Sequence, residues 1–179
     1  NTEAEKSFSA MCNPSVKIES AGGSIIGRIE LNGVTIAGIG QAKQIVLTYN
    51  PLKYAFNKGD MVPALTKLTV VNGNFKIVRD SHGKLNLSSL VPTANQKKTT
   101  TPVFHGWLII KDCRAVYRDE RGWHPEPRRF ELPTEKLNGW IDLRGTDSVK
   151  FNLSGLVPEK VKAKGLFNLQ TNTYELKIE

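Results

Sequence analysis

Apolar and polar residues alternate along several stretches of this chain, the pattern of a β-strand with one buried and one solvated side. Half-solvated strands of this kind belong to antiparallel sheets, whereas strands of parallel α/β sheets carry continuous apolar runs. The pattern therefore predicts a mainly β fold with antiparallel strands. The clearest stretches are 25–31, 45–49, 75–78, 149–154, 160–169 and 174–178.

Two Asn-Gly dipeptides, Asn32-Gly33 and Asn72-Gly73, separate alternating stretches. Asn-Gly is the strongest short signal for a two-residue β-hairpin turn, so we expect a hairpin at each of them. Segments of the form Asp-x-x-Gly at 80–83 and 119–122 predict further turns.

Two short segments favour helix. Residues 3–12 combine Ala, Glu and Lys with a few apolar positions. Near 51–58, Asn50 is suited to cap the helix, Pro51 to its first position and Gly59 to its end. We expect the buried stripe of this second helix to be Leu52, Ala55 and Phe56.

The organisation along the chain follows from these elements and from one polar stretch. We divide it into an N-terminal helical segment at 1–15, a first β unit at 16–92, a flexible loop at 93–102 and a second β unit at 103–179.

Part of the chain is self-similar. Val70–Gly83 can be set over Ile109–Gly122, an offset of 39 residues (109 − 70), with Arg, Asp and Gly coinciding. This similarity indicates either a repeated strand–turn unit or only the general likeness between successive hairpins.

The charge balance is basic, with 25 Lys and Arg against 17 Asp and Glu, a net charge of +8. Such a balance fits an acidic partner or simply a soluble surface. Nucleic-acid binding usually interleaves aromatic residues with a basic stripe, but the tryptophans here are dispersed. We therefore expect no nucleic-acid partner.

No pattern of residues indicates catalysis. The histidines, His82, His105 and His124, do not stand in metal-ligand spacings, and no phosphate-binding or nucleophile motif is present. We expect no enzyme activity, no catalytic or metal-binding residues and no cofactor. Cys12 and Cys113 lie far apart in the sequence, and could form a disulfide in an oxidising compartment or remain two thiols.

Nearly the whole chain, from Val16 onwards, resembles the N-terminal periplasmic region of AsmA-like proteins, and within that family the branch of the translocation and assembly module. The matching pattern is a strand pair, then a strand leading into a short helix at 47–59, then a second strand pair. Its positions are Gly27, Leu31, Gly33, Val34 and Ile36, followed by Arg79, Asp80, Gly83, Asn86, Leu87 and Leu90.

The resemblance implies a curved, extended sheet that forms a long β-groove, or β-taco, in the periplasm. Its apolar inside would carry phospholipid acyl chains from the inner to the outer membrane and support outer-membrane protein assembly. The implied partners are phospholipid acyl chains, the remainder of a longer chain and an outer-membrane barrel protein. The implied inner-membrane anchor lies outside this sequence.

Acyl chains need only apolar walls, so the apolar sides of the predicted strands are the candidate lipid-binding residues. The same residues could instead pack on one another as a closed core. In that case the rival function is a structural β-rich module that docks a protein through a sheet edge. The candidates are Ile25, Ile29, Ile45, Leu47, Phe75, Ile77, Val116, Phe151, Leu153, Val161, Phe167, Leu176 and Ile178.

Overall fold

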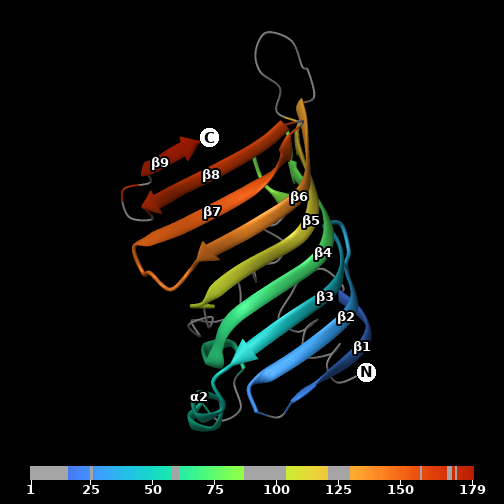
Figure 1. Cartoon of the computed structure of the whole chain (residues 1–179), viewed down its shortest axis with the longest axis vertical. Helices are drawn as coiled ribbons and strands as arrows, with labels where there is room; N and C mark the ends of the chain where they lie inside the picture. The colour runs from blue at the N-terminus through green and yellow to red at the C-terminus, as the bar shows by residue number, and fades with distance from the viewer. Residues whose placement is uncertain are drawn as a thin grey trace.

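The fold is one open β-sheet with little helix, as Figure 1 shows for the computed structural model. The structure describes residues 16–24, 26–57, 61–86, 104–120, 130–157, 159–168, 171 and 173–179. Its helices are α2 (Pro51–Phe56) and the short 3-10 helix η1 (Val62–Ala64). Its strands are β1 (Val16–Ser24), β2 (Arg28–Ile36), β3 (Gly40–Tyr49), β4 (Leu65–Arg79), β5 (Trp107–Asp119), β6 (Phe130–Asp142), β7 (Ser148–Val157), β8 (Glu159–Asn168) and β9 (Thr173–Ile178).

The strands lie side by side in chain order, from β1 at one edge to β9 at the other (Figure 1). Every neighbouring pair is antiparallel except β4 and β5. Extensive contacts between the described elements are confined to adjacent strands and to α2 with η1. The predicted mainly β, mostly antiparallel, curved sheet is therefore confirmed.

The parallel pair β4–β5 joins the self-similar parts of the sequence. Val70 lies opposite Ile110, and Arg79 lies opposite Asp119, so the two segments run in the same direction side by side. The side chains of Arg79 and Asp119 also form an ion pair, with Nη1 and Oδ2 3.5 Å apart. The similar sequences thus lie side by side, but one residue out of step, because the pairing has an offset of 40 residues (110 − 70) and the similarity an offset of 39.

The hairpins predicted at Asn32-Gly33 and Asn72-Gly73 are wrong. Both dipeptides lie inside continuous strands, β2 and β4. Gly33 and Asn72 nevertheless take the left-handed φ that Asn-Gly favours, 59° and 49°. The chain uses that conformation to bend a strand and not to reverse it.

Asp112 in β5 and Lys136 in β6 adopt the same left-handed backbone, with φ of 48° and 49°. Together with Gly33 and Asn72 they form a line of irregular positions across the sheet, which we call the bulge line. The register between β5 and β6 shifts there. Asn138 bridges the irregularity, since its Oδ1 accepts from the Asp112 N–H at 2.9 Å and its Nδ2 donates to the Lys136 carbonyl at 2.8 Å.

Bulges bend strands and raise their twist, which accounts for the curvature of the long strands in Figure 1. They also change the phase of the alternation. Leu31 and Val34 are three residues apart in β2, yet both belong to the same apolar core, and Ile110 and Cys113 repeat this spacing in β5. The spacing keeps apolar side chains on one face on both sides of the bulge line.

Helix α2 begins and ends close to the predicted limits. The Asn50 side chain accepts hydrogen bonds from the N–H groups of Leu52 and Lys53, at 3.0 and 3.1 Å. The predicted buried stripe is wrong, because α2 has no buried residue. The predicted helix at 3–12, the loop at 93–102, residues 121–122 of the predicted 119–122 turn and Gly59 lie outside the described residues.

The turn predicted at 80–83 is confirmed. Asp80 Oδ1 accepts from the N–H groups of His82 and Lys84, at 2.9 and 2.8 Å, and Gly83 takes a φ of 83°. These contacts explain why Asp and Gly stand at these two positions.

Asn86 then binds the far end of β4. Its Nδ2 donates to the carbonyls of Gly38 and Lys76, at 2.9 and 2.7 Å, and its Oδ1 accepts from the Val78 N–H at 3.0 Å. This one side chain satisfies backbone groups of β4 beyond Phe75, which lies opposite Gly40, the first residue of β3.

We predict that Asn86→Ala lowers the free energy of unfolding by about 1–3 kcal/mol, because it leaves backbone groups of β4 without these partners. Asn86→Asp keeps the shape but loses both donors, and should also destabilise. Urea unfolding followed by circular dichroism measures both changes. Wild-type stability in both variants would contradict the structural role of Asn86.

Candidate functional site

One face of the sheet is apolar from edge to edge. Residues directly opposite one another on neighbouring strands share a face, so the strand register defines rows across the sheet. We call the face that carries the following two rows the apolar face. The first row is Gly23, Ile29, Leu47, Leu68, Leu108, Ile141, Phe151, Gly165 and Leu176, and the second is Ala21, Leu31, Ile45, Val70, Ile110, Gly139, Leu153, Ala163 and Ile178.

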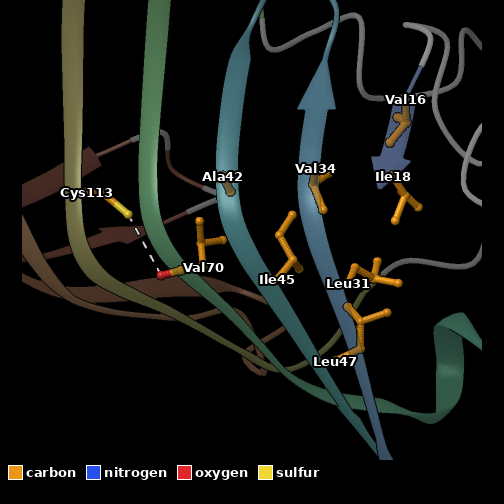
Figure 2. Packing of buried hydrophobic residues seen from close by; sticks show 9 residues of the cluster. All are labelled: Val16, Ile18, Leu31, Val34, Ala42, Ile45, Leu47, Val70 and Cys113. Atoms are coloured by element: carbon orange, nitrogen blue, oxygen red, sulfur yellow. Dashed lines mark hydrogen bonds between the residues drawn. The ribbon is translucent and has the colours of Figure 1, made fainter. Parts of the chain in front are cut away.

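The apolar face is buried in β2–β4 and becomes exposed towards β9. Leu31 is 1% exposed and belongs to the core cluster drawn in Figure 2, whose side chains come from β1–β5. In β7 and β8 the side chains of these rows are half-buried. At β9, Leu176 and Ile178 are 50% and 65% exposed. The face is thus a closed core in its first half and an accessible apolar surface in its last strands.

Most of the candidate residues predicted from the sequence lie on the apolar face. Ile45 and Leu47 are buried in its core, and Ile29 and Phe75 pack against that core. Across β7 and β8 the candidates are half-buried. The candidates on this face are Ile29, Ile45, Leu47, Phe75, Ile77, Phe151, Leu153, Val161, Phe167, Leu176 and Ile178.

The assignment of Val116 to this face is wrong, and Ile25 lies outside the described residues. Val116 lies opposite Lys76 and Pro133, while Tyr117 lies opposite Ile77. The bulge at Asp112 shifts the phase of β5 by one residue, so the apolar side beyond it falls on the odd positions. Strict alternation counted along β5 without the bulge therefore places Val116 on the apolar face, where the structure places Tyr117.

Sequence reasoning missed Leu68, Val70, Leu108, Ile110 and Ile141, which complete the rows in the middle of the sheet. The run from Trp107 to Ile110 has no polar residue, because its other face carries an aromatic cluster. A strand with apolar residues on both faces does not alternate, so its inward side cannot be identified from the pattern alone. The pairing with β4 supplies that information.

The opposite face carries mainly polar side chains. In β2 and β3, Gln44 Nε2 donates to Glu30 and Asn32, both at 3.2 Å, and Asn32 Nδ2 donates to Ser20 at 3.3 Å. A hollow of about 760 Å³ lies over these amides, and another of about 820 Å³ lies farther along the strands, beside the β2–β3 turn. Because the amides bond to one another, this region is best explained as a self-satisfied polar surface.

On the same face, Trp107 and Trp140 pack edge to face, with ring centroids 5.2 Å apart. Arg144 stacks over Trp107 at 4.4 Å and binds both carboxylate oxygens of Asp142, each at 2.9 Å. Its hydrogen bonds lower the pKa of Asp142 from 3.8 to about 2, against the opposing effect of burial. This cluster ties the β6–β7 connection to the start of β5.

Cys113 is a free, buried thiol at the centre of the sheet, and Cys12 lies outside the described residues. The Cys113 sulfur accepts from the Gly73 N–H at 3.2 Å and lies 3.8 Å from the Val70 carbonyl, the contact marked in Figure 2. A Cβ at residue 73 would meet that sulfur and the ring of Phe75. Cys113 therefore fills the space that Gly73 leaves, as a small apolar residue would.

The described residues carry no cluster of His, Cys, Asp or Glu that could hold a metal ion. None of the helices in the described part of the chain is both long and apolar enough to cross a membrane. The apolar face, in contrast, offers a continuous surface without a charged side chain in its two central rows. The apolar face is therefore the candidate binding surface.

We predict that two leucines on the apolar face respond differently to truncation. Leu31→Ala should lower the free energy of unfolding by about 2–5 kcal/mol, because it opens a cavity in a packed core. Leu176→Ala should change it by no more than about 0.5–1 kcal/mol, because half of that side chain already contacts water. Chemical denaturation measures both, and equal losses would contradict the gradient of burial.

We also predict a pH dependence at the Asp142–Arg144 pair. Because the folded state lowers the pKa of Asp142, the pair stabilises fully above about pH 4, and the effect disappears as pH falls towards 2. The effect is small, since Arg144 is mostly exposed. Melting temperatures of wild type and Asp142→Asn should therefore differ at pH 6 and converge near pH 2. A constant difference across that range would contradict the assignment.

Comparisons with protein-family models and with curated proteins found no match for this chain.

Proposed function

We propose that the apolar face binds the acyl chains of phospholipids, and that the binding region is the part formed by β7, β8 and β9. The observation that carries the proposal is the exposure of Leu176 and Ile178 at the end of two rows that are otherwise apolar throughout. Exposed apolar surface of this extent on a folded domain marks a place where something else binds.

The composition of this region favours an acyl chain over a polar ligand. The rows contribute Phe151, Leu153 and Ala163 beside the exposed β9 residues, and none of them has a hydrogen-bonding side chain. Gly165 makes room for the ring of Phe151, because a Cβ there would meet that ring at 2.6 Å. A flexible hydrocarbon chain needs such a surface and no fixed polar contact.

The polar side of the same strands supports this proposal. Lys162, Lys164 and Lys177 are exposed there, alternating along β8 and β9 with the apolar residues. The Lys177 ammonium lowers the pKa of Glu179 through a hydrogen bond and its charge, and Lys164 adds to that effect. The lysines keep this face solvated while the other remains free for hydrocarbon.

In this proposal the chain is a periplasmic segment of an AsmA-like protein of the TamB branch, anchored in the inner membrane outside this sequence. It forms part of a path for phospholipid between inner and outer membrane, together with the rest of a longer chain and an outer-membrane barrel partner. What supports the assignment is the motif resemblance. Gly33, Asp80, Gly83 and Asn86 occupy the turn and bulge positions where their residue types are needed.

The test is photo-crosslinking to a phospholipid that carries a diazirine on its acyl chain. We predict that Leu176→Asp and Ile178→Asp each reduce crosslinking on the order of tenfold, because a carboxylate beside hydrocarbon has no partner and remains unsolvated. Both positions are exposed, so the variants should keep the wild-type unfolding transition.

Lys177→Asp is the matched control, since it places the same residue on the same strand but on the opposite face. It should leave crosslinking unchanged. Equal losses in all three variants, or no crosslinking of the wild type, would overturn the proposal.

A second function is favoured by the open edges of the sheet. Among the described strands β9 pairs only with β8, so one side of its backbone is available to another strand, as in docking through a sheet edge. In that case an organic extract of the purified protein would contain no phospholipid, and a peptide partner would protect the amides of β9 from hydrogen exchange.

A further inference from the structure

The end of the sheet that carries α2 exposes large apolar side chains that do not belong to the apolar face. Ile26 in the β1–β2 turn is 83% exposed, and Leu52 and Phe56 in α2 are 69% and 84% exposed. Leu52 and Phe56 are four residues apart, so they lie on the same side of the helix. We call Ile26, Leu52 and Phe56, together with Lys53, the α2 tip.

The parts of the α2 tip are held next to each other. The Gly27 carbonyl accepts from the Tyr49 N–H at 2.9 Å, and a Cβ on Gly27 would lie 3.8 Å from the ring of Pro51. The β1–β2 turn therefore contacts the start of α2, and Figure 1 shows both at the same end of the sheet. Ile26 is presented beside the helix that carries Leu52 and Phe56.

The α2 tip is also fixed in conformation. Asn50 caps the helix through two backbone N–H groups, and its own N–H donates to the Ala64 carbonyl at 2.9 Å. The ring of Tyr54 packs edge to face on Tyr49, with centroids 5.8 Å apart. With the helix anchored through Tyr54, Leu52 and Phe56 are displayed on a rigid support, which lowers the entropy cost of binding.

One lysine belongs to the α2 tip, and a second lies on the adjoining strand. Lys53 lies between the exposed apolar residues of α2 and is itself exposed, and Lys67 is exposed on the adjoining part of β4. The chain as a whole carries a net charge of +8. Projecting apolar side chains flanked by lysines are the arrangement by which peripheral proteins insert into anionic lipid surfaces.

We propose that the α2 tip inserts its apolar side chains into the surface of an anionic phospholipid bilayer. A second copy of the chain is disfavoured as the occupant, because a few side chains on a tip bury far less area than a stable dimer requires. The proposal is independent of acyl-chain binding by the apolar face, since the two sites share no residue.

The test is co-sedimentation with vesicles of phosphatidylcholine mixed with phosphatidylglycerol, compared with vesicles of phosphatidylcholine alone. We expect the wild type to bind the mixed vesicles more strongly, and to be released as the salt concentration rises. The double variant Leu52→Ser/Phe56→Ser should reduce the partition coefficient on the order of tenfold or more. Lys53→Glu should weaken binding to the mixed vesicles only.

Leu85→Ser is the matched control, because Leu85 is also exposed but lies beyond the other end of β4. It should bind like the wild type, as should the apolar-face variant Ile178→Asp. All substituted positions are exposed, so unfolding transitions should remain unchanged, and this is verified for each variant.

Equal binding of the double variant and the wild type would overturn the proposal, as would a wild type that does not sediment with mixed vesicles. Self-association that depends on Leu52 and Phe56 would overturn it in favour of a second copy. If Ile178→Asp loses acyl crosslinking but still binds vesicles, the two sites act separately. Failure of one proposal is then distinguishable from failure of the other.

Discussion

The whole structure depends on keeping apolar side chains on one face of strands that must also bend. In a regular strand the face alternates with every residue, and a bend made with one extra residue would turn the apolar side towards water. Here β2 and β5 compensate in their sequences, with Leu31 and Val34 in β2 and Ile110 and Cys113 in β5 set three residues apart across the bend. Curvature and a continuous apolar face are therefore encoded together.

This constraint also determines where binding can occur. The described strands make extensive contacts only with their neighbours, so they do not form a second layer over the apolar face. In the described structure the face is buried around Leu31 and accessible at Ile178. The part around Leu31 stabilises the fold, and the part around Ile178 provides accessible apolar surface. A substitution at Leu31 therefore affects stability, and one at Ile178 affects the accessible surface.

The fold class could be predicted from the sequence because alternation, Asn50 and Pro51 are local signals. The faces could be predicted only up to the bulges: Val116 was assigned to the wrong side because the left-handed turn of the backbone at Asp112 has no unique sequence signature. Asn-Gly at 72–73 indicated the correct conformation but not its use within a strand. The exposure of Leu52 and Phe56 could not be predicted, because the apolar stripe of a helix is visible in the sequence but the element that would cover it is not.

The parallel contact between β4 and β5 has a consequence for folding. All other pairs of consecutive strands are antiparallel, whereas β4 and β5 are parallel, so the end of β4 and the start of β5 lie at opposite ends of the sheet. Closing the loop between them costs more chain entropy than any hairpin, so we expect the two antiparallel halves to form first and to join last. Until they join, each half presents an unpaired edge, β4 or β5, and the period before joining is when aggregation competes with folding.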